Sequence, residues 1–553
     1  MLAVVLAILT VPLAAGAASL FLPARLAVGV TVVSGLACLG LVLALIPGAA
    51  AGTFSGLAGY LRVDAVSVIF LLATGFLYAA VAVYAVGYLQ ADRDARYVRR
   101  CCAGLSVFAW AMLAAPLMGS LALLWIAIEV TTIVSALLVA LDDTDAAVEA
   151  AWKYVLIASS GLGLALLGTV LAYYAGAQVL GDHYDLAIQS LITAGPRLPA
   201  TPVRLAFLLA TLGFGTKVGL FPVHTWLPDA HSQAPTPVSA LLSGALLATS
   251  FYAILRFYQV AVGTLGAGFP NATLLAFGVA SLLLAALYVF GQRDVKRLLA
   301  YSSVEHMGIL AIGVSFGAPV ALAGVLLHVL AHAAAKGNAF MGAGVFTVKY
   351  RTKEISAMRG GLAVLPWSGP LFLLAIFALG ALPPFGVFRS EFEIVAGGLG
   401  AGGYTPAAVL VVLVTVAFVG LATAATRVLL TPPPAGPVAG DRQLVAFGTG
   451  PAAGAGSALG AGPLDEAGPV GAVAGDGVAT GAQANRVAIA VRTRSLPSQA
   501  EKASEVPARG EPSAWMVVPV LTGLAVLVLL GVHPPAELAN LITRAAAELR
   551  GAP

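Results

Sequence analysis

The sequence predicts an all-α integral membrane protein with about fourteen transmembrane helices. Of its 553 residues, 60% are hydrophobic and only 10% are charged, and the mean hydropathy of +0.96 lies far above the range of soluble domains. Apolar runs recur along the chain, each close to the ~20 residues that cross a hydrocarbon core. Because unpaired backbone groups cannot face lipid, runs of this length have to be helices.

The expected membrane spans begin at the second residue and continue to the C-terminal region. In chain order they are 2–22, 25–47, 64–89, 101–119, 121–141, 153–178, 203–221, 237–262, 270–291, 298–316, 319–346, 364–398, 405–430 and 514–532. The first span contains small residues that would suit signal cleavage, but no basic segment precedes it, which favours a retained helix.

The distribution of basic residues predicts the orientation. Four basic clusters follow the third, ninth, eleventh and thirteenth spans: Arg93, Arg96, Arg99 and Arg100; Arg293, Lys296 and Arg297; Lys349, Arg351, Lys353 and Arg359; and Arg442, Arg486, Arg492, Arg494, Lys502 and Arg509. The positive-inside rule therefore places the loops after odd-numbered spans in the cytoplasm and both termini outside. We expect a multi-pass protein of a prokaryotic inner membrane, and we find no nucleic-acid motif.

The chain divides into five expected parts. They are 1–100, the first three helices; 101–262 and 270–430, two five-helix repeats; 431–513, a flexible cytoplasmic linker rich in Gly, Ala and Pro; and 514–532, a last helix. Pro222 is expected to break the seventh helix, and Pro383 and Pro384 the twelfth. Because five helices separate these breaks, equivalent repeats would be inverted, as in many transporters.

Ionisable residues inside the expected spans are candidate functional groups, because each costs at least about 2.5–3.5 kcal/mol there. Several stand well inside the spans or at helix breaks: Glu129, Lys217, Glu305, His306, His328, His332, Lys336 and Glu391. They are strung across several helices, which predicts a polar line through the bundle.

His328, His332 and Lys336 follow one another at intervals of four residues, close to one helix face. Two histidines at this spacing can bind zinc, but the pair lacks an intervening Glu and an obvious further ligand. A proton relay suits the row better, because histidine exchanges protons near neutral pH. The alternative is a water-filled polar seam, and we expect no metal.

Glu129 and Lys217 suit each other as an ion pair whose approach or separation would change the proton affinity of the lysine. The alternative is a static pair that fastens two helices. His224, Asp229 and His231 follow Pro222 near the cytoplasmic end, where loop capping and proton uptake are both open. The TWLPDAH stretch, with Pro228, predicts a re-entrant turn.

Two long motifs resemble those of the antiporter-like membrane subunits shared by respiratory complex I, Mrp-type cation/proton antiporters and group 4 hydrogenases. They are KVGLFPVHTWLPDAHSQAPTPVSALLSG and RDVKRLLAYSSVEHMGI, and the resemblance covers roughly residues 60–430. The sequence segments SVEHMG and PPFGVFRSEF are most similar to those of the F-subunit branch of hydrogenase-4.

The resemblance implies roles for particular residues. It makes Glu129 and Lys217 partners, Lys296 the lysine before AYSS, and Glu391 the terminal acidic group. It also makes His328, His332 and Lys336 the central relay. Glu305 and His306 are secondary candidates. Ala248 stands where many members carry a Lys or His, which leaves a gap to be bridged by water, by Ser243, Thr249 or Ser250, or not at all.

From this resemblance we expect a proton-translocating subunit without a redox centre of its own. Iron-sulfur, nickel-iron or flavin centres would lie in partner subunits, and the partners would be other membrane subunits and a peripheral redox arm. No cofactor motif occurs in the chain, and Cys38, Cys101 and Cys102 lack ligand spacing. The alternatives are an Mrp-type antiporter subunit, a proton-channel partner of an inorganic-carbon uptake complex, and a structural scaffold.

Overall fold

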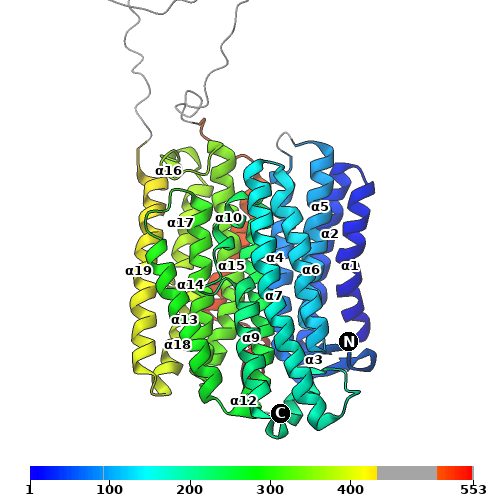
Figure 1. Cartoon of the computed structure of the whole chain (residues 1–553). Helices are drawn as coiled ribbons and strands as arrows, with labels where there is room; N and C mark the ends of the chain where they lie inside the picture. Colours follow the sequence, from blue (N-terminus) through cyan, green and yellow to red (C-terminus); the bar gives the residue numbers. More distant parts are fainter. Residues whose placement is uncertain (91–92, 433–506, 551–553) are drawn as a thin grey trace, which may run out of the picture. The chain divides into compact units, whose positions relative to one another are not determined.

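The computed structural model describes residues 1–90, 93–432 and 507–550, and long helices dominate it (Figure 1). The expected linker, with Arg442, Arg486, Arg492, Arg494 and Lys502, lies almost wholly outside the described residues. The helices are α1 Leu2–Phe21, α2 Ala24–Leu43, α3 Ile46–Ala51, α4 Ala65–Tyr88, α5 Ala95–Ala114, α6 Leu121–Val139, α7 Asp145–Leu180, α8 Ile188–Ala194, α9 Ala200–Val218, α10 Trp226–Gln233, α11 Thr236–Leu241, α12 Leu247–Leu265, α13 Gly268–Tyr288, α14 Val295–Ser315, α15 Pro319–Tyr350, α16 Gly361–Val364, α17 Ser368–Leu379, α18 Gly386–Gly400, α19 Tyr404–Leu430, α21 Ala514–Val532 and α22 Ala536–Leu549.

The predicted all-α membrane fold is confirmed. In the described part of the chain, 12 helical segments are long and apolar enough to cross a membrane. The two expected spans that are not among these twelve are 203–221 and 364–398, which are the two expected to be broken. The inverted relation between the two halves stays a prediction.

Both breaks occur at the prolines that predict them. Helix α9 ends at Val218, Gly219 adopts the left-handed conformation with φ 85°, and the chain passes through Phe221–Pro222 before α10 begins. Helix α17 ends at Leu379, and α18 begins at Gly386, beyond Pro383 and Pro384. Proline lacks the N–H that would continue a helix, so each break leaves backbone groups without helical partners.

Three local features differ from the expectations. The TWLPDAH stretch forms helix α10 rather than a turn, because Pro228 lies in the first turn, where no N–H is needed. A short hairpin pairs β1 (Phe54–Gly56) with β2 (Leu61–Val63). Helix α22 was not expected, since it is too short and polar to span a membrane.

The polar residues of interest lie on central helices. The most apolar 18 residues of each span differ in how far they are buried. All of them are buried in Thr236–Leu265, 94% in Val295–Ser315 and 89% in Pro319–Tyr350, but only 28% are buried in Tyr404–Leu430. In Figure 1, α15 runs through the middle of the bundle, with α1 and α19 at opposite edges. Buried ionisable side chains of α14 and α15 therefore face neighbouring helices, not lipid: Glu305, His306, His328, His332 and Lys336.

The basic loops gather at one end of the bundle. Asp294, before α14, forms an isolated antiparallel β-bridge through its backbone with Glu354 in the loop after α15. Lys349 donates a hydrogen bond to the Gly510 carbonyl oxygen at 2.7 Å, and the Gly360 N–H donates to Thr431 at 2.8 Å. The two described ends that flank residues 433–506 therefore both lie beside the basic loop that follows α15.

Candidate functional site

Lys217 lies at the C-terminal end of α9, one residue before the break, and its side chain is fully buried. Its ammonium donates hydrogen bonds to the hydroxyl of Thr132 on α6 at 2.7 Å and to that of Tyr154 on α7 at 2.5 Å. The Tyr154 hydroxyl in turn lies 2.7 Å from the Ser135 hydroxyl. Lys217 therefore begins a short chain of buried hydroxyl groups.

Glu129 and Lys217 do not form the expected direct ion pair. Within the described residues, no carboxylate oxygen lies within the 4.0 Å limit of an ion pair from Lys217. Glu129 accepts a hydrogen bond from Ser159 at 3.0 Å instead, and its Oε2 is buried without a partner. The physical reason is that the hydroxyls of Thr132 and Tyr154 occupy the space around the ammonium.

Close contact between α7 and α9 sets the position of Lys217. A Cβ on Gly213 would lie only 2.6 Å from the Gly161 carbonyl oxygen, and closer still to the backbone nitrogen of Ala165. Only glycine allows this approach. Because Gly213 precedes Lys217 by one helical turn, the close contact holds the lysine beside Tyr154.

A second buried lysine, Lys336 on α15, has the same kind of surroundings. Its ammonium donates to the hydroxyl of Ser302 on α14, and to the Leu299 carbonyl oxygen at 3.1 Å. Ser303, next in α14, bonds to the hydroxyl of Ser243 at 2.7 Å. Each of the two buried lysines therefore donates to at least one hydroxyl group of a neighbouring helix.

Three histidines gather next to Lys336. The ring centroid of His306 on α14 lies 5.2 Å from those of both His328 and His332 on α15. His306 Nδ1 is 3.1 Å from His328 Nε2 and 4.0 Å from an oxygen of Glu391 on α18. The sequence pattern assigns His306 only a secondary place, yet it is the residue that joins His328 to Glu391.

Hydroxyl groups bridge only part of the gap that Ala248 leaves between Lys217 and Lys336. Thr249 and Ser250 donate to carbonyl oxygens of their own helix, at 2.9 and 3.0 Å, so their hydroxyls do not join the clusters. Ser243 does reach the second cluster through Ser303. Between the Lys217 cluster and Ser243, the described side chains offer no continuous hydrogen-bond chain.

The residues after the first break have separate roles. Asp229 forms a partly exposed ion pair with Arg297 at 3.2 Å. His231 is fully buried and stacks on Phe340, with centroids 5.2 Å apart and both ring nitrogens unpaired, and a ring nitrogen of buried His224 also lacks a partner. These contacts join α10 to its neighbours.

The remaining candidates lie close to the basic end or inside the second cluster. Lys296 donates to the Ala234 carbonyl oxygen at 2.5 Å. Nearby Lys353 bonds to the Ser232 carbonyl oxygen at 2.7 Å; burial lowers the pKa of Lys353, and the Asp294 carboxylate opposes that shift. Glu305 is buried, and one of its carboxylate oxygens has no partner.

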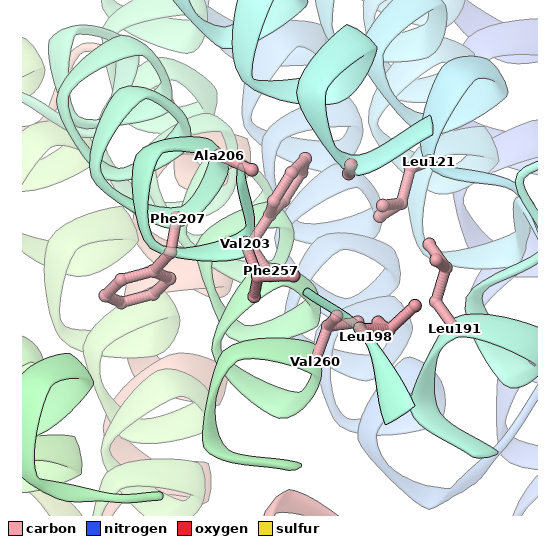
Figure 2. Close-up of a pocket in the computed structure, with 9 residues that line it drawn as sticks. Leu121, Leu191, Leu198, Val203, Ala206, Phe207, Phe257 and Val260 are labelled. Carbon is pink, nitrogen blue, oxygen red and sulfur yellow. The ribbon is translucent and has the colours of Figure 1, made fainter. Parts of the chain in front are cut away.

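Two cavities differ in chemistry. One, of about 10 Å³, is walled by apolar residues of α6, α9 and α12 such as Leu121, Phe207 and Phe257 (Figure 2), and holds at most one water. The other, of about 360 Å³, lies between α17, α18 and α19 and has Glu391 in its wall. Only the second one reaches a candidate site residue.

A further buried charge network was missed from the sequence. Arg256 on α12 is fully buried and donates to both carboxylate oxygens of Asp64, at 2.6 and 2.7 Å, while Arg62 bonds the same carboxylate at 2.9 Å. Arg256 also contacts Gln259, which donates to the carbonyl oxygen of Glu548 on α22. The signal was available, since Arg256 lies inside an expected span.

Comparison with known proteins identifies the family. Residues 118–418, more than half of the chain, match the family model described as NADH:quinone oxidoreductase/Mrp antiporter, transmembrane. The chain belongs to this family. The predicted resemblance is therefore confirmed.

Individual relatives agree with the family. The hydrogenase-4 component F homolog of Methylacidiphilum infernorum is 34% identical over 362 residues, which is 64% of this chain and 76% of that protein. A chain in the structure of the Mrp complex from Dietzia sp. has a TM-score of 0.77 at 20% identity, over 99% of this chain and 97% of that one. A chain of respiratory complex I from Thermus thermophilus has a TM-score of 0.72 at 23% identity, over 99% of each. These two likenesses establish the fold. Together with the family match, they make the chain an antiporter-like, multi-pass membrane subunit.

Proposed function

We propose that the protein is a proton-translocating membrane subunit of a complex I-like or membrane-bound hydrogenase complex. The observation that carries the proposal is the pair of fully buried lysines, Lys217 and Lys336, whose ammonium groups bond to hydroxyls. Buried charges inside a membrane bundle are costly, and they mark ion and proton pathways.

Hydroxyl partners suit a lysine that gains and loses a proton. A hydroxyl accepts a hydrogen bond from the ammonium and can donate one to the neutral amine, whereas a carboxylate can only accept. Thr132 and Tyr154 therefore fit both forms of Lys217. Glu129, three residues before Thr132 on the same helix, would favour the charged form when it moves closer.

From Lys336 the polar line continues through His332, His306 and His328 to Glu391. The two broken helices lie at the ends of this line, since α9 carries Lys217 and α18 carries Glu391. We propose that residues 101–262 and 270–430 are the two inverted repeats that each supply one of these ends. Water would have to carry protons past Ala248.

We propose that partner subunits, not this chain, carry out the redox chemistry of the complex. The chain would contribute proton transfer, while iron-sulfur, nickel-iron or flavin centres of a peripheral arm would drive it. We propose the inner membrane of a prokaryote as the location, with the basic loops in the cytoplasm and both termini outside.

An Mrp-type cation/proton antiporter is the second candidate, because the matching family model covers both kinds of protein. Purification of the native complex would separate the two. Co-purification of hydrogenase or quinone-reductase subunits supports the first, and a complex of membrane antiporter subunits without a redox arm supports the second.

The test of the proposed function is proton uptake by vesicles that contain the complex with Lys217→Ala. Uptake should fall at least tenfold, because the amine that exchanges the proton is gone. Lys153→Ala is the matched control, since Lys153 lies partly exposed on α7 and, among the described residues, forms an ion pair with Glu149 alone. Unchanged uptake in an assembled Lys217→Ala complex would refute the proposal.

A further inference from the structure

We infer that His306, His328 and Glu391 form a binding site for a transition-metal dication of the Zn²⁺ class. The three residues come from α14, α15 and α18, and all are buried. One ligand atom from each lies within 4.8 Å of the other two. Such a site joins the broken helix α18 to two central helices.

The spacing of the atoms fits tetrahedral coordination. With metal–ligand bonds of about 2.0–2.1 Å, the ligand atoms of a tetrahedral zinc site lie about 3.3 Å apart. His306 Nδ1 and His328 Nε2 are 3.1 Å apart, and His306 Nδ1 and Glu391 Oε1 are 4.0 Å apart. A side-chain shift of Glu391 by roughly 1 Å would bring all three close to that spacing.

Ser390 prepares His328 as a ligand. The Ser390 hydroxyl donates to the Val387 carbonyl oxygen at 2.7 Å, so its oxygen accepts the hydrogen bond from His328 Nδ1 at 2.9 Å. His328 therefore carries its proton on Nδ1, and the lone pair of Nε2 points toward His306. A hydrogen bond of this kind behind a histidine ligand is a common feature of metal sites.

Several buried polar atoms of this cluster have no hydrogen-bond partner among the described residues. They include Glu391 Oε1, His306 Nε2 and both ring nitrogens of His332. Glu391 is only 7% exposed. Buried polar groups normally have partners, and a carboxylate that faces imidazole nitrogens is satisfied by a cation held between them.

The donor set selects the class of metal. Two imidazoles and one carboxylate suit Zn²⁺ and Co²⁺, whereas Mg²⁺ and Ca²⁺ prefer oxygen ligands alone. Three protein ligands leave a fourth position for water. His332 lies beside His306, with ring centroids 5.2 Å apart.

The sequence could not reveal this site. The spacing of His328 and His332 first points to zinc, yet His332 is not among the three residues whose ligand atoms gather. The other two ligands lie 22 residues before and 63 residues after His328, on different helices. Only the fold brings them together.

The experiment is titration of the purified full-length protein with Co²⁺, followed by its visible absorption, and then competition with Zn²⁺. We expect one tetrahedral Co²⁺ per chain, displaced by Zn²⁺. His306→Gln and His328→Gln should each weaken binding at least tenfold, and Ser390→Ala about tenfold, because it removes the support of His328. His231→Gln is the matched control, since His231 is a buried histidine that stacks on Phe340 and is not one of the three residues whose ligand atoms gather.

Binding that persists unchanged in both histidine variants, or no tetrahedral Co²⁺ signal in the wild type, would overturn the inference. If a histidine variant does not fold, Ser390→Ala and a rise in the thermal midpoint of the wild type with Zn²⁺ remain as tests. The readout is metal binding, not transport, so this inference and the proposed function can fail separately.

Discussion

At the scale of single residues, the two buried lysines have similar surroundings. Lys217 and Lys336 are fully buried, and each directs its ammonium at hydroxyl groups of neighbouring helices. A carboxylate partner can only accept and favours the charged lysine, but a hydroxyl can also donate to the neutral amine and so suits either protonation state. The hydroxyls of Tyr154 and Ser302 are therefore as much a part of the candidate path as the lysines.

Tyr154→Phe tests this view of the hydroxyls. The variant removes the oxygen that accepts from Lys217 at 2.5 Å and that bonds Ser135. A hydrogen bond to a charged group contributes about 1.5–3 kcal/mol, so we expect vesicle proton uptake to slow about tenfold or more.

Tyr78→Phe is the matched control. Tyr78 is another buried tyrosine, and its hydroxyl bonds those of Ser34 and Ser106, but no lysine of the described residues forms a hydrogen bond with it. This variant should keep normal uptake with a similar small loss of thermal stability. Equal uptake by the two variants would remove Tyr154 from the path.

The individual contacts of the site were largely beyond prediction from the sequence. Charges inside apolar spans are rare enough to single out Lys217, Lys336 and Glu391. Serines, threonines and tyrosines are ordinary in such spans, so nothing in the sequence distinguishes Ser302 or Tyr154 from a residue that faces lipid. Which hydroxyl meets which lysine depends on how the helices rotate and pack.

At the scale of the elements, the breaks in the two helices were predictable and the close approach of helices was not. Pro222, Pro383 and Pro384 interrupt a helix for a local covalent reason. Gly213 is different, because its importance depends on Ala165 lying opposite. Helix α22 escaped prediction because it is too short to span a membrane, and its apolar face is buried only by packing on α15, α4 and α3.

Gly213→Ala should push α9 away from α7. Its new methyl group would meet the α7 backbone, only 2.6 Å from the Gly161 carbonyl oxygen, and overpacking of this kind costs about 1–3 kcal/mol. We expect a lower thermal midpoint together with slower proton uptake, because Lys217 moves with α9.

Gly215→Ala serves as the control on the same helix. A Cβ at Gly215 would lie 3.5 Å from its nearest neighbour, an ordinary contact, and alanine favours a helix by about 1 kcal/mol over glycine. Stability and uptake should be unchanged or slightly raised. If both variants behaved alike, the contact between α7 and α9 would not position Lys217.

The network of Arg256 and Asp64 belongs to the same scale, because it ties α12 to the start of α4 and to α22. Asp64→Ala leaves a fully buried guanidinium with no carboxylate in contact, which costs about 3–5 kcal/mol. The thermal midpoint should fall clearly, and amide hydrogen exchange in α22 should increase.

Glu393→Ala supplies the comparison for that prediction. Glu393 pairs with Arg389 at 2.9 Å on the same helix, and both side chains are partly exposed, so its loss should cost less than about 1 kcal/mol. A similarly small effect of Asp64→Ala would mean that the network adds little to the docking of α22.

At the scale of the whole molecule, the described loops divide between two ends of the bundle. The basic loops before α14 and after α15 meet each other and the residues that flank α19 and α21. At the other end, α22 bonds to α3 and to the first turn of α4. Arg544 donates to the Ala50 carbonyl oxygen at 3.0 Å, and Glu548 accepts from the N–H of Val66 at 3.2 Å. Because the two ends are distinct, the positive-inside rule predicts which end faces the cytoplasm, and this prediction can be tested.

Labelling with a membrane-impermeant maleimide tests that orientation. The native thiols of Cys38, Cys101 and Cys102 are buried, so single introduced cysteines would report without interference. Ala357→Cys lies in the exposed basic loop after α15, and Ala267→Cys and Ala401→Cys lie in exposed loops that the charge rule places outside. In intact spheroplasts, Ala267→Cys and Ala401→Cys should be labelled and Ala357→Cys should not, whereas inverted vesicles should give the reverse. The opposite pattern would reverse the assignment of sides, and with it the side from which protons reach Lys217, while leaving the buried path itself unchanged.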